Sequence, residues 1–207
     1  MIATADPEGR PYAEDENVST DVGEETTDAE LAARCQRDPD LFTAVHDRYH
    51  RDIYLYVAGR LDIQIAEDLA AETFLVAFDR RDRYDPERGE LRPWLFGIAT
   101  NLIARHRRKE TRRYRALAKL DPQPVVEGHE DRVVTSVAAE RMQPHLARAL
   151  AALTGGERDV LLLVALGQLS YDEVAQALGI AVGTVGSRLS RARTKIMARI
   201  DKGNVRG

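Results

Sequence analysis

Residues 169–189 read Leu-Ser-Tyr-Asp-Glu-Val-Ala-Gln-Ala-Leu-Gly-Ile-Ala-Val-Gly-Thr-Val-Gly-Ser-Arg-Leu, which is the layout of a helix-turn-helix. Ser170 and Glu173 form a capping box that begins the first helix, and Gly179 can take the left-handed conformation that ends it. Ala175 is small where two helices must cross closely. The apolar wedge between the two helices is expected to consist of Val174, Leu178, Val185 and Leu189.

The second helix of this pair, expected from about Val182 to Ile200, has a polar face suited to a DNA major groove. Residues 188–199 contain five basic residues and no acidic one. The alternative is an ordinary helical hairpin whose basic face is only solvated. The run of basic residues without an acidic one favours DNA binding over this alternative. By their three- and four-residue spacing, the groove-facing residues are Thr184, Ser187, Arg188 and Arg191.

The rest of the chain also shows apolar residues at helical spacing and no sustained strand alternation, so we predict an all-α fold. Helices are expected over about 27–36, 39–61 and 63–78 and from 91 onward, the first of them opened by a capping box at Thr27 and Glu30. Residues 121–128 hold two prolines and a glycine without helical spacing. Helical spacing returns at about residue 138, and a further capping box is expected at Thr154 and Glu157.

This pattern predicts two small helical domains joined by a flexible linker, the second domain containing the helix-turn-helix. The expected units are an acidic, disordered N-terminal extension over 1–26, a four-helix domain over 27–115, a linker over 116–137, a second domain over 138–201 and a tail over 202–207.

The composition of the 207 residues describes a soluble protein, with 43% hydrophobic and 31% charged residues and a mean hydropathy of −0.40. No apolar run approaches the roughly 20 residues that cross a bilayer, and the acidic N-terminus does not resemble a signal peptide. A cytoplasmic location without membrane insertion is therefore expected. The lone Cys35 excludes an internal disulfide and a cysteine-rich metal site.

Charge is segregated along the chain although the net charge is only −4. Residues 1–30 carry a net charge of −9, whereas residues 105–119 carry +7. With the basic run over 188–199, the chain has two separate basic patches, and we expect two contacts with a polyanion.

The first basic patch follows an aromatic segment, Trp94-Leu-Phe, and aromatic rings beside arginines can hold unstacked bases and phosphates. Core packing is the simpler role for Trp94. Asn101 is polar within an apolar stretch. Its amide could hydrogen-bond to the edge of a base, and an ordinary position on the helix surface explains it equally well. On a third segment, Asp68 and Glu72 lie one helical turn apart, and their spacing alone favours a solvated acidic face.

Three motifs in this order resemble regions 2 and 4 of the extracytoplasmic-function (group IV) bacterial sigma factors, over roughly residues 28–200. They are Ala66-Glu-Asp-Leu-Ala-Ala-Glu-Thr-Phe74, Arg92-Pro-Trp-Leu-Phe-Gly-Ile-Ala-Thr-Asn101 and the helix-turn-helix segment. The resemblance implies that core RNA polymerase and promoter DNA are partners, with contacts at the β′ coiled coil and the β flap. Since many relatives are held by an anti-sigma protein, it also raises such a protein as a partner.

The resemblance also assigns residues to each contact. Core polymerase binding falls to Asp68, Glu72 and Phe74. Contact with the −10 element, including a flipped-out base, falls to Tyr84, Arg88, Asn101, Arg105, Arg107, Arg108 and Arg112. Contact with the −35 element falls to Thr184, Ser187, Arg188, Ser190, Arg191 and Arg193. The chain departs from the family at Gly186, where relatives usually have arginine or lysine, so its −35 readout is expected to be weaker or different.

Two small DNA-facing domains would have to reach elements more than two helical turns apart, at about 34 Å per turn. A relaxed linker of about 22 residues spans about 25 Å and a stretched one about 75 Å. RNA polymerase is therefore expected to hold the linker extended. Binding of flipped bases would offset the few kcal/mol that unstacking costs. No glycine-rich phosphate-binding loop is present in the sequence, so no nucleotide cofactor is expected.

Two other classes of protein remain as alternatives. A stand-alone helix-turn-helix regulator would explain residues 138–200 but would leave Asp68 and Glu72 without a role. An enzyme with a metal site at His46 and His50 is the second alternative, and the pair lacks the glutamate that follows the first histidine in zinc proteases. We therefore expect no catalytic residue, no metal and no cofactor.

Overall fold

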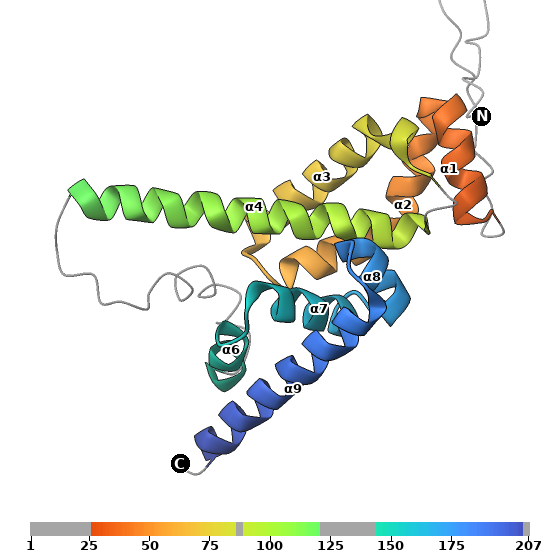
Figure 1. The fold of residues 1–207 in the computed structure, drawn as a ribbon. Coiled ribbons are helices and arrows are strands. Elements are labelled where there is room, and N and C mark those ends of the chain that lie inside the picture. Colours follow the sequence, from red (N-terminus) through yellow and green to blue (C-terminus); the bar gives the residue numbers. More distant parts are fainter. Residues whose placement is uncertain (1–25, 86–88, 121–143, 205–207) are drawn as a thin grey trace, which may run out of the picture.

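The computed structural model describes residues 26–85, 89–120 and 144–204. Within these ranges every regular element is a helix, as Figure 1 shows, which confirms the all-α prediction. No helix among the described residues is both long and apolar enough to span a membrane.

The helices form two lobes that are separated in sequence. The N-terminal lobe consists of α1 (Asp28–Arg37), η1 (Pro39–Leu41), α2 (Phe42–Ala58), α3 (Ile63–Asp79), η2 (Arg81–Arg83) and α4 (Leu91–Leu120). The C-terminal lobe consists of α6 (Pro144–Ala151), α7 (Gly155–Ala165), α8 (Tyr171–Leu178) and α9 (Val182–Asn204).

The predicted helix boundaries are set by local capping chemistry. Thr27, Thr154 and Ser170 each accept a hydrogen bond from the backbone three residues on, and the glutamate there bonds back to the cap backbone. Gly179 has φ of 62° and closes α8 in the left-handed conformation. The two ends of α8, and with them the turn that leads into α9, are therefore set by Ser170 and Gly179.

Three helices end at a clearly different residue from the one expected. Helix α9 runs to Asn204, past the end expected at about Ile200 and into the tail expected from residue 202. Helix α2 ends at Ala58, with Gly59 as its C-cap, instead of continuing through the glycine to residue 61. Helix α4 runs on to Leu120, beyond the domain limit expected at 115, because residues 109–120 are mostly good helix formers and no proline occurs before residue 122. The remainder of the predicted linker and its continuation to residue 143 lie outside the described residues, as does the acidic extension up to residue 25.

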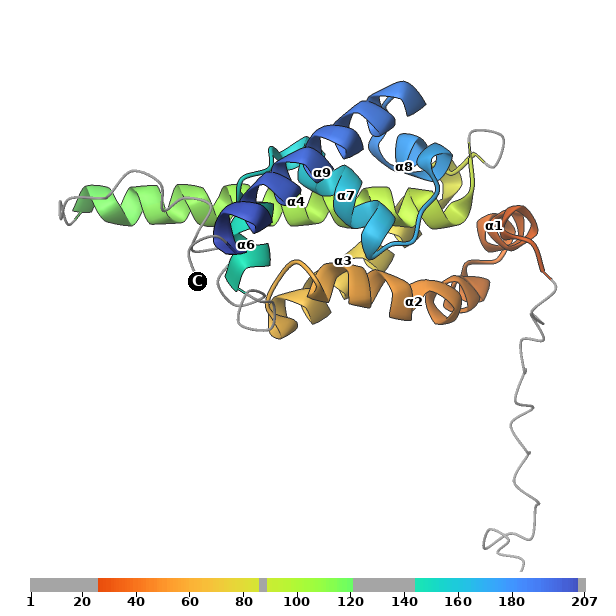
Figure 2. The same ribbon diagram turned by 90° about the horizontal axis from the view of Figure 1, so that it is seen from below.

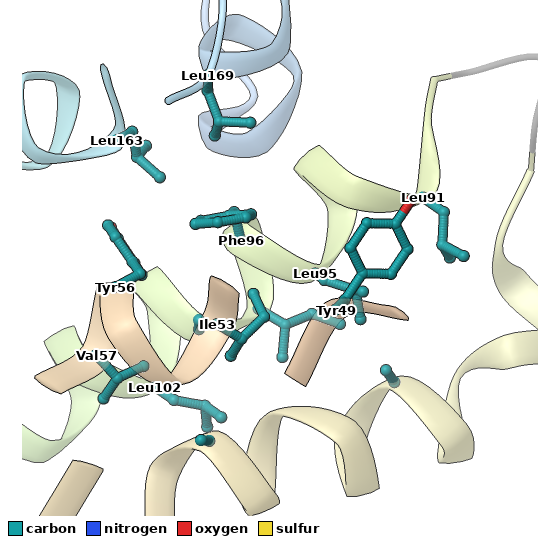
Figure 3. Packing of buried hydrophobic residues seen from close by; sticks show 14 of the residues in the cluster. Tyr49, Ile53, Tyr56, Val57, Leu91, Leu95, Phe96, Leu102, Leu163 and Leu169 are labelled. Carbon is teal, nitrogen blue, oxygen red and sulfur yellow. The ribbon is translucent and has the colours of Figure 1, made fainter. Parts of the chain in front are cut away.

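The two lobes share a hydrophobic core. Phe96 of α4 is fully buried, and its ring centroid lies 5.1 Å from that of Tyr56 in α2. Figure 3 shows Phe96 between Tyr56 and two leucines of the C-terminal lobe, Leu163 and Leu169. The long helix α4 is thus the part of the N-terminal lobe that meets the C-terminal lobe, with α2 on one side of it and α8 and α9 on the other (Figure 2).

Candidate nucleic-acid and polymerase interfaces

A hollow of about 320 Å³ lies where the start of α4 meets the segment after η2 and the end of α8. Trp94 and Asn101 both line it because they are seven residues apart on α4, two turns along one face. Arg80 and Arg83 line it as well. The hollow, called the α4 hollow below, therefore combines an aromatic ring, an amide and cationic side chains. Planar, anionic ligands suit that combination.

Tyr84 forms part of the wall of the α4 hollow. It is only 7% exposed, its ring centroid lies 5.2 Å from that of Trp94, and its hydroxyl donates a hydrogen bond to the Gly89 carbonyl at 2.9 Å. Burial, reinforced by the nearby carboxylates of Asp28 and Glu90, raises the pKa of Tyr84 to about 12. The hydroxyl is thus neutral and already bonded, which leaves the ring as the part that Tyr84 offers a ligand.

Asn101 is exposed at the rim of the hollow, beside the basic end of α4. Arg105, Arg108 and Arg112 continue along that end with exposed side chains. Arg88, which was expected to act with them, lies outside the described residues.

Arg107 does not join this basic surface. Its guanidinium turns toward the end of α2, where Nη2 donates a hydrogen bond to the Arg60 carbonyl at 3.2 Å. Arg107 lies two residues from Arg105, about 200° around the helix, and therefore belongs to a different face. Arg107 is partly buried there, and its expected contact with the DNA backbone stays a prediction.

On α3, Asp68 is exposed and Glu72 partly so. Phe74, which was expected to share their surface, is only 5% exposed, and its ring lies 4.9 Å from that of His46. Phe74 also lines the surface of α3 beside Leu75, and its expected contact with core polymerase stays a prediction. An apolar groove of about 560 Å³ adjoins the same part of α3, and Leu75, 66% exposed, stands at its edge.

The histidine pair on α2 packs against this groove. The ring centroids of His46 and His50 lie 4.7 Å apart, and His46 Nδ1 is 3.2 Å from Asp47. Among the described residues, no group of three or more histidine, cysteine, aspartate or glutamate side chains is arranged to hold a metal ion. The His46 ring meets the Phe74 ring edge-on, and the His50 ring is tilted against it with centroids 6.0 Å apart.

Helix α9 presents a polar face opposite its buried one. Val185, Leu189 and Ala192 are buried against the rest of the C-terminal lobe. The exposed residues on this helix include Ser187, Ser190, Arg191 and Arg193, whereas Thr184 and Arg188 are partly covered. At Gly186 an added Cβ would meet nothing within 4 Å, so this helix face has open space at that position.

A buried carboxylate ties α9 to α7. Glu157 accepts hydrogen bonds from Lys195 at 2.7 and 2.9 Å, and the Arg191 Nε lies 3.9 Å from it. The Lys195 bond, followed by the capping bond to Thr154, lowers the pKa of Glu157 to about 2. Sequence reasoning identified the cap and missed the lysine, because nothing local links residues so far apart.

Sequence reasoning also missed a set of polar contacts between the lobes. Arg92 of α4 donates to Glu173 at 3.2 Å and to the Gly167 carbonyl at 2.6 Å. Gln176 of α8 exchanges two hydrogen bonds with the backbone of Glu90, at 2.8 and 3.1 Å. Arg60, only 4% exposed, forms an ion pair with Asp159 of α7 and donates to Tyr56.

Two family models match this chain. The Sigma-70 region 2 model covers residues 45–113, and the Sigma-70, region 4 model covers residues 145–196. The first range contains the acidic face of α3 and most of the residues that line the α4 hollow. The second contains the helix-turn-helix, including Gln176 and Ala177, which line the same hollow.

Curated relatives match most of the chain. The ECF RNA polymerase sigma factor SigC of Mycobacterium tuberculosis is 33% identical over 164 residues, which cover 76% of this chain and 82% of that protein. The ECF RNA polymerase sigma factor SigW of Bacillus subtilis is 32% identical over 167 residues, covering 75% of this chain and 87% of that protein.

Solved structures agree with these matches. The structure of CnrH in complex with the cytosolic domain of CnrY is 27% identical, with a TM-score of 0.59 over 84% of this chain and 97% of that chain. The Bartonella quintana sigma factor RpoE, solved with the anti-sigma factor NepR, is 22% identical and shares the fold, with a TM-score of 0.56 over 77% of this chain and 96% of that chain.

Proposed function

This chain belongs to the extracytoplasmic-function group of the sigma-70 family of RNA polymerase sigma factors, and from that membership we propose how its residues divide the work of promoter recognition. It is a sigma factor, which directs core RNA polymerase to promoters, and not a stand-alone regulator. The proteins of this family are not enzymes. The domain limits expected from the sequence, 27–115 for region 2, 116–137 for the linker and 138–201 for region 4, are part of the proposal.

Region 2 captures one unpaired base of the −10 element in the α4 hollow. Trp94 and Tyr84 supply ring surfaces, and the Asn101 amide supplies donors and acceptors for a base edge. The exposed arginines beyond it, Arg105, Arg108 and Arg112, neutralise the backbone of the same strand. Stacking and hydrogen bonding of the extruded base offset the cost of melting, so no nucleotide hydrolysis is required.

Region 4 reads the −35 element with α9. Ser187, Ser190, Arg191 and Arg193 face the major groove, and Thr184 and Arg188 stand at its border. The tie between Glu157 and Lys195 fixes α9 on its lobe, so these side chains present one rigid face. Because residue 186 is a glycine with open space around it, region 4 lacks the contact that a lysine or arginine at this position would make.

Core polymerase docks on the acidic face of α3, with Asp68 and Glu72 as the charged contacts and the apolar groove beside Leu75 as the adjoining surface. The partner surface proposed here is the β′ coiled coil, while region 4 contacts the β flap. An anti-sigma protein is a further proposed partner, supported by the structural likeness to CnrH, which was solved with the cytosolic domain of CnrY.

The observation that carries this proposal is that Trp94 and Asn101 line one hollow on α4, the helix that continues from Asn101 into a run of exposed arginines. Permanganate reactivity of unpaired thymines in the polymerase–promoter complex tests it. Asn101→Ala should reduce reactivity in the −10 region while the complex still forms. Arg51→Ala, a change at an exposed position of α2 outside the proposed DNA and polymerase surfaces, is the control. Full reactivity with Asn101→Ala would remove the amide from base capture.

A further inference from the structure

Three cationic side chains of α9 lie around one carboxylate in the first turn of α7. Lys195 Nζ donates to both oxygens of Glu157, at 2.7 and 2.9 Å, and Arg191 Nε lies 3.9 Å from Oε1. Arg188 reaches the same turn, because a Cβ added at Gly156 would lie 2.9 Å from its Nη1. In the described part of the chain, no other carboxylate pairs with any of these three cations. Glu157 is therefore the acidic group on which they converge.

Glu157 lies beneath its cations and is itself held in place. Its side chain is 6% exposed, whereas those of Arg191 and Lys195 are 62% and 43% exposed. Its Oε2 also accepts a hydrogen bond from the Thr154 backbone N–H at 2.9 Å, so the carboxylate is fixed to the start of α7. A carboxylate this buried does not touch DNA. Any effect of Glu157 on DNA recognition must therefore pass through the exposed cations.

Arg191 connects this carboxylate to the proposed −35 face. It lies one helical turn after Ser187, which is exposed on that face, and one turn before Lys195. Its guanidinium meets Glu157 through Nε. The two Nη groups, which carry most of its donors, form no hydrogen bond with any residue that the structure describes. Two neighbouring donors of this kind match the O6 and N7 acceptors of a guanine in the major groove.

We infer that Glu157 is a positioning residue for −35 recognition: it holds Arg191 through Nε and leaves the two Nη groups to bind one guanine. This rests on the proposed function of α9. An arginine that is already ordered loses less rotamer freedom when it binds a base, so the tie favours DNA binding without a contact of its own. Lys195 supplies the main charge balance of Glu157. Because guanine presents this pair of acceptors, the effect is confined to one G·C pair.

The test uses the full-length chain bound to core polymerase, with promoter duplexes in which each −35 base pair is replaced in turn. Glu157→Gln removes the charge and keeps a side chain that can still cap α7, since glutamine also serves at this position of a capping box. Lys195→Gln is the matched control, because it breaks the same tie between α7 and α9 but leaves the carboxylate for Arg191. Arg191→Lys keeps the positive charge and lacks the planar pair of donors.

Competition binding measures the base preference at each −35 position. Arg191→Lys should lose at least about tenfold discrimination at one G·C pair. Glu157→Gln should lose at least about threefold at the same pair, and it should have no further effect when combined with Arg191→Lys. Lys195→Gln should keep the wild-type preference at that pair, although both Lys195→Gln and Glu157→Gln lower the thermal midpoint. Circular dichroism verifies that each variant retains its helices.

Equal losses for Glu157→Gln and Lys195→Gln at every −35 pair would overturn the inference, since the tie would then serve only the fold of region 4. Unchanged preference for Glu157→Gln at the pair that Arg191→Lys disturbs would overturn it as well. If Arg193→Ala changes the −35 preference and Arg191→Lys does not, only the inference fails. If neither of them changes it at any position, the proposed −35 function of α9 is wrong.

Discussion

The guanidinium of Arg105 lies 2.5 Å from the carboxylate of Glu72. This pair joins the proposed DNA-backbone contact on α4 to the proposed polymerase contact on α3. Both side chains are substantially exposed, at 66% and 36%, so the pair contributes little to stability, of order 0–1 kcal/mol. Arg105 can therefore leave Glu72 for a DNA phosphate, and Glu72 can leave Arg105 for a cation of the polymerase, at a small cost in free energy.

Charge reversal on the acidic face of α3 tests the docking surface. The double variant Asp68→Lys and Glu72→Lys should lose binding to core polymerase by at least tenfold, because two attractive contacts become repulsive. The control Glu67→Lys and Asp79→Lys makes the same charge change at exposed positions of the same helix and should bind normally. Pull-down of core polymerase measures both. Equal recovery of polymerase by the two double variants would exclude this face.

Asn101 and Arg105 should differ in the way they affect DNA binding. Asn101→Ala should weaken binding by about 1–3 kcal/mol for the preferred −10 base and leave the salt dependence unchanged, as expected for a base contact. Arg105→Ala should weaken binding to all sequences and reduce the slope of log K against log salt by about one. Titrations of the polymerase complex with −10 variants at several salt concentrations separate the two. The assignments would be wrong if Asn101→Ala lowered the salt slope and spared base preference.

Arg188 lies at the border of the −35 face, with its guanidinium next to Gly156, where an added Cβ would come within 2.9 Å of Nη1. Arg188→Ala should weaken recognition of the −35 element by about 1–3 kcal/mol if the side chain swings outward to a base. Competition among −35 variants, measured with the polymerase complex, gives this value. Unchanged discrimination would show that Arg188 stays against α7 and takes no part in readout.

Replacing glycine by alanine should have different effects on thermal stability at positions 186 and 97. Gly186→Ala should stabilise α9 by up to about 1 kcal/mol, because the helix gains propensity and the added Cβ meets open space. Gly97→Ala gains the same propensity but pushes against the Ala177 carbonyl, so its thermal midpoint should not rise. Thermal unfolding of the two full-length variants compares them. A higher midpoint for Gly97→Ala than for Gly186→Ala would contradict the close approach of α8 and α4.

The tie between Glu157 and Lys195 should make region 4 sensitive to acid. Because the folded-state pKa of Glu157 is about 2, below the ordinary value of 4.5, its contribution to stability is complete above pH 4.5 and is lost as pH falls toward 2. Glu157→Gln should thus lower the thermal midpoint at pH 7 and have a progressively smaller effect between pH 4.5 and 2. A difference between variant and wild type that persists unchanged at pH 2 would contradict the ion pair.

The features that sequence reasoning predicted correctly are local ones. The capping boxes at Thr27, Thr154 and Ser170 and the left-handed Gly179 each depend on residues within one or two turns. Two site residues, Phe74 and Arg107, are less exposed than expected, although helical periodicity contained the signal. Phe74 lies two residues after Glu72, as Arg107 does after Arg105, so each is turned about 200° away from the face to which it was assigned.

The contact between the lobes could not be predicted in the same way. Arg60 and Asp159 are 99 positions apart, and no periodicity or cap links them. The glycine at position 97 also has no local explanation. It is needed because the backbone of α8, in the other lobe, leaves no room for a Cβ there. Long-range pairing of this kind depends on the assembled shape of both lobes.

Run-off transcription with core RNA polymerase and a library of genomic promoters tests the central claim most directly. Core polymerase with the full-length chain should produce transcripts from a defined set of promoters that share −10 and −35 elements, and core polymerase alone should not. A chain that binds duplex operators tightly without polymerase, yet yields no promoter-specific transcript with it, would contradict the account.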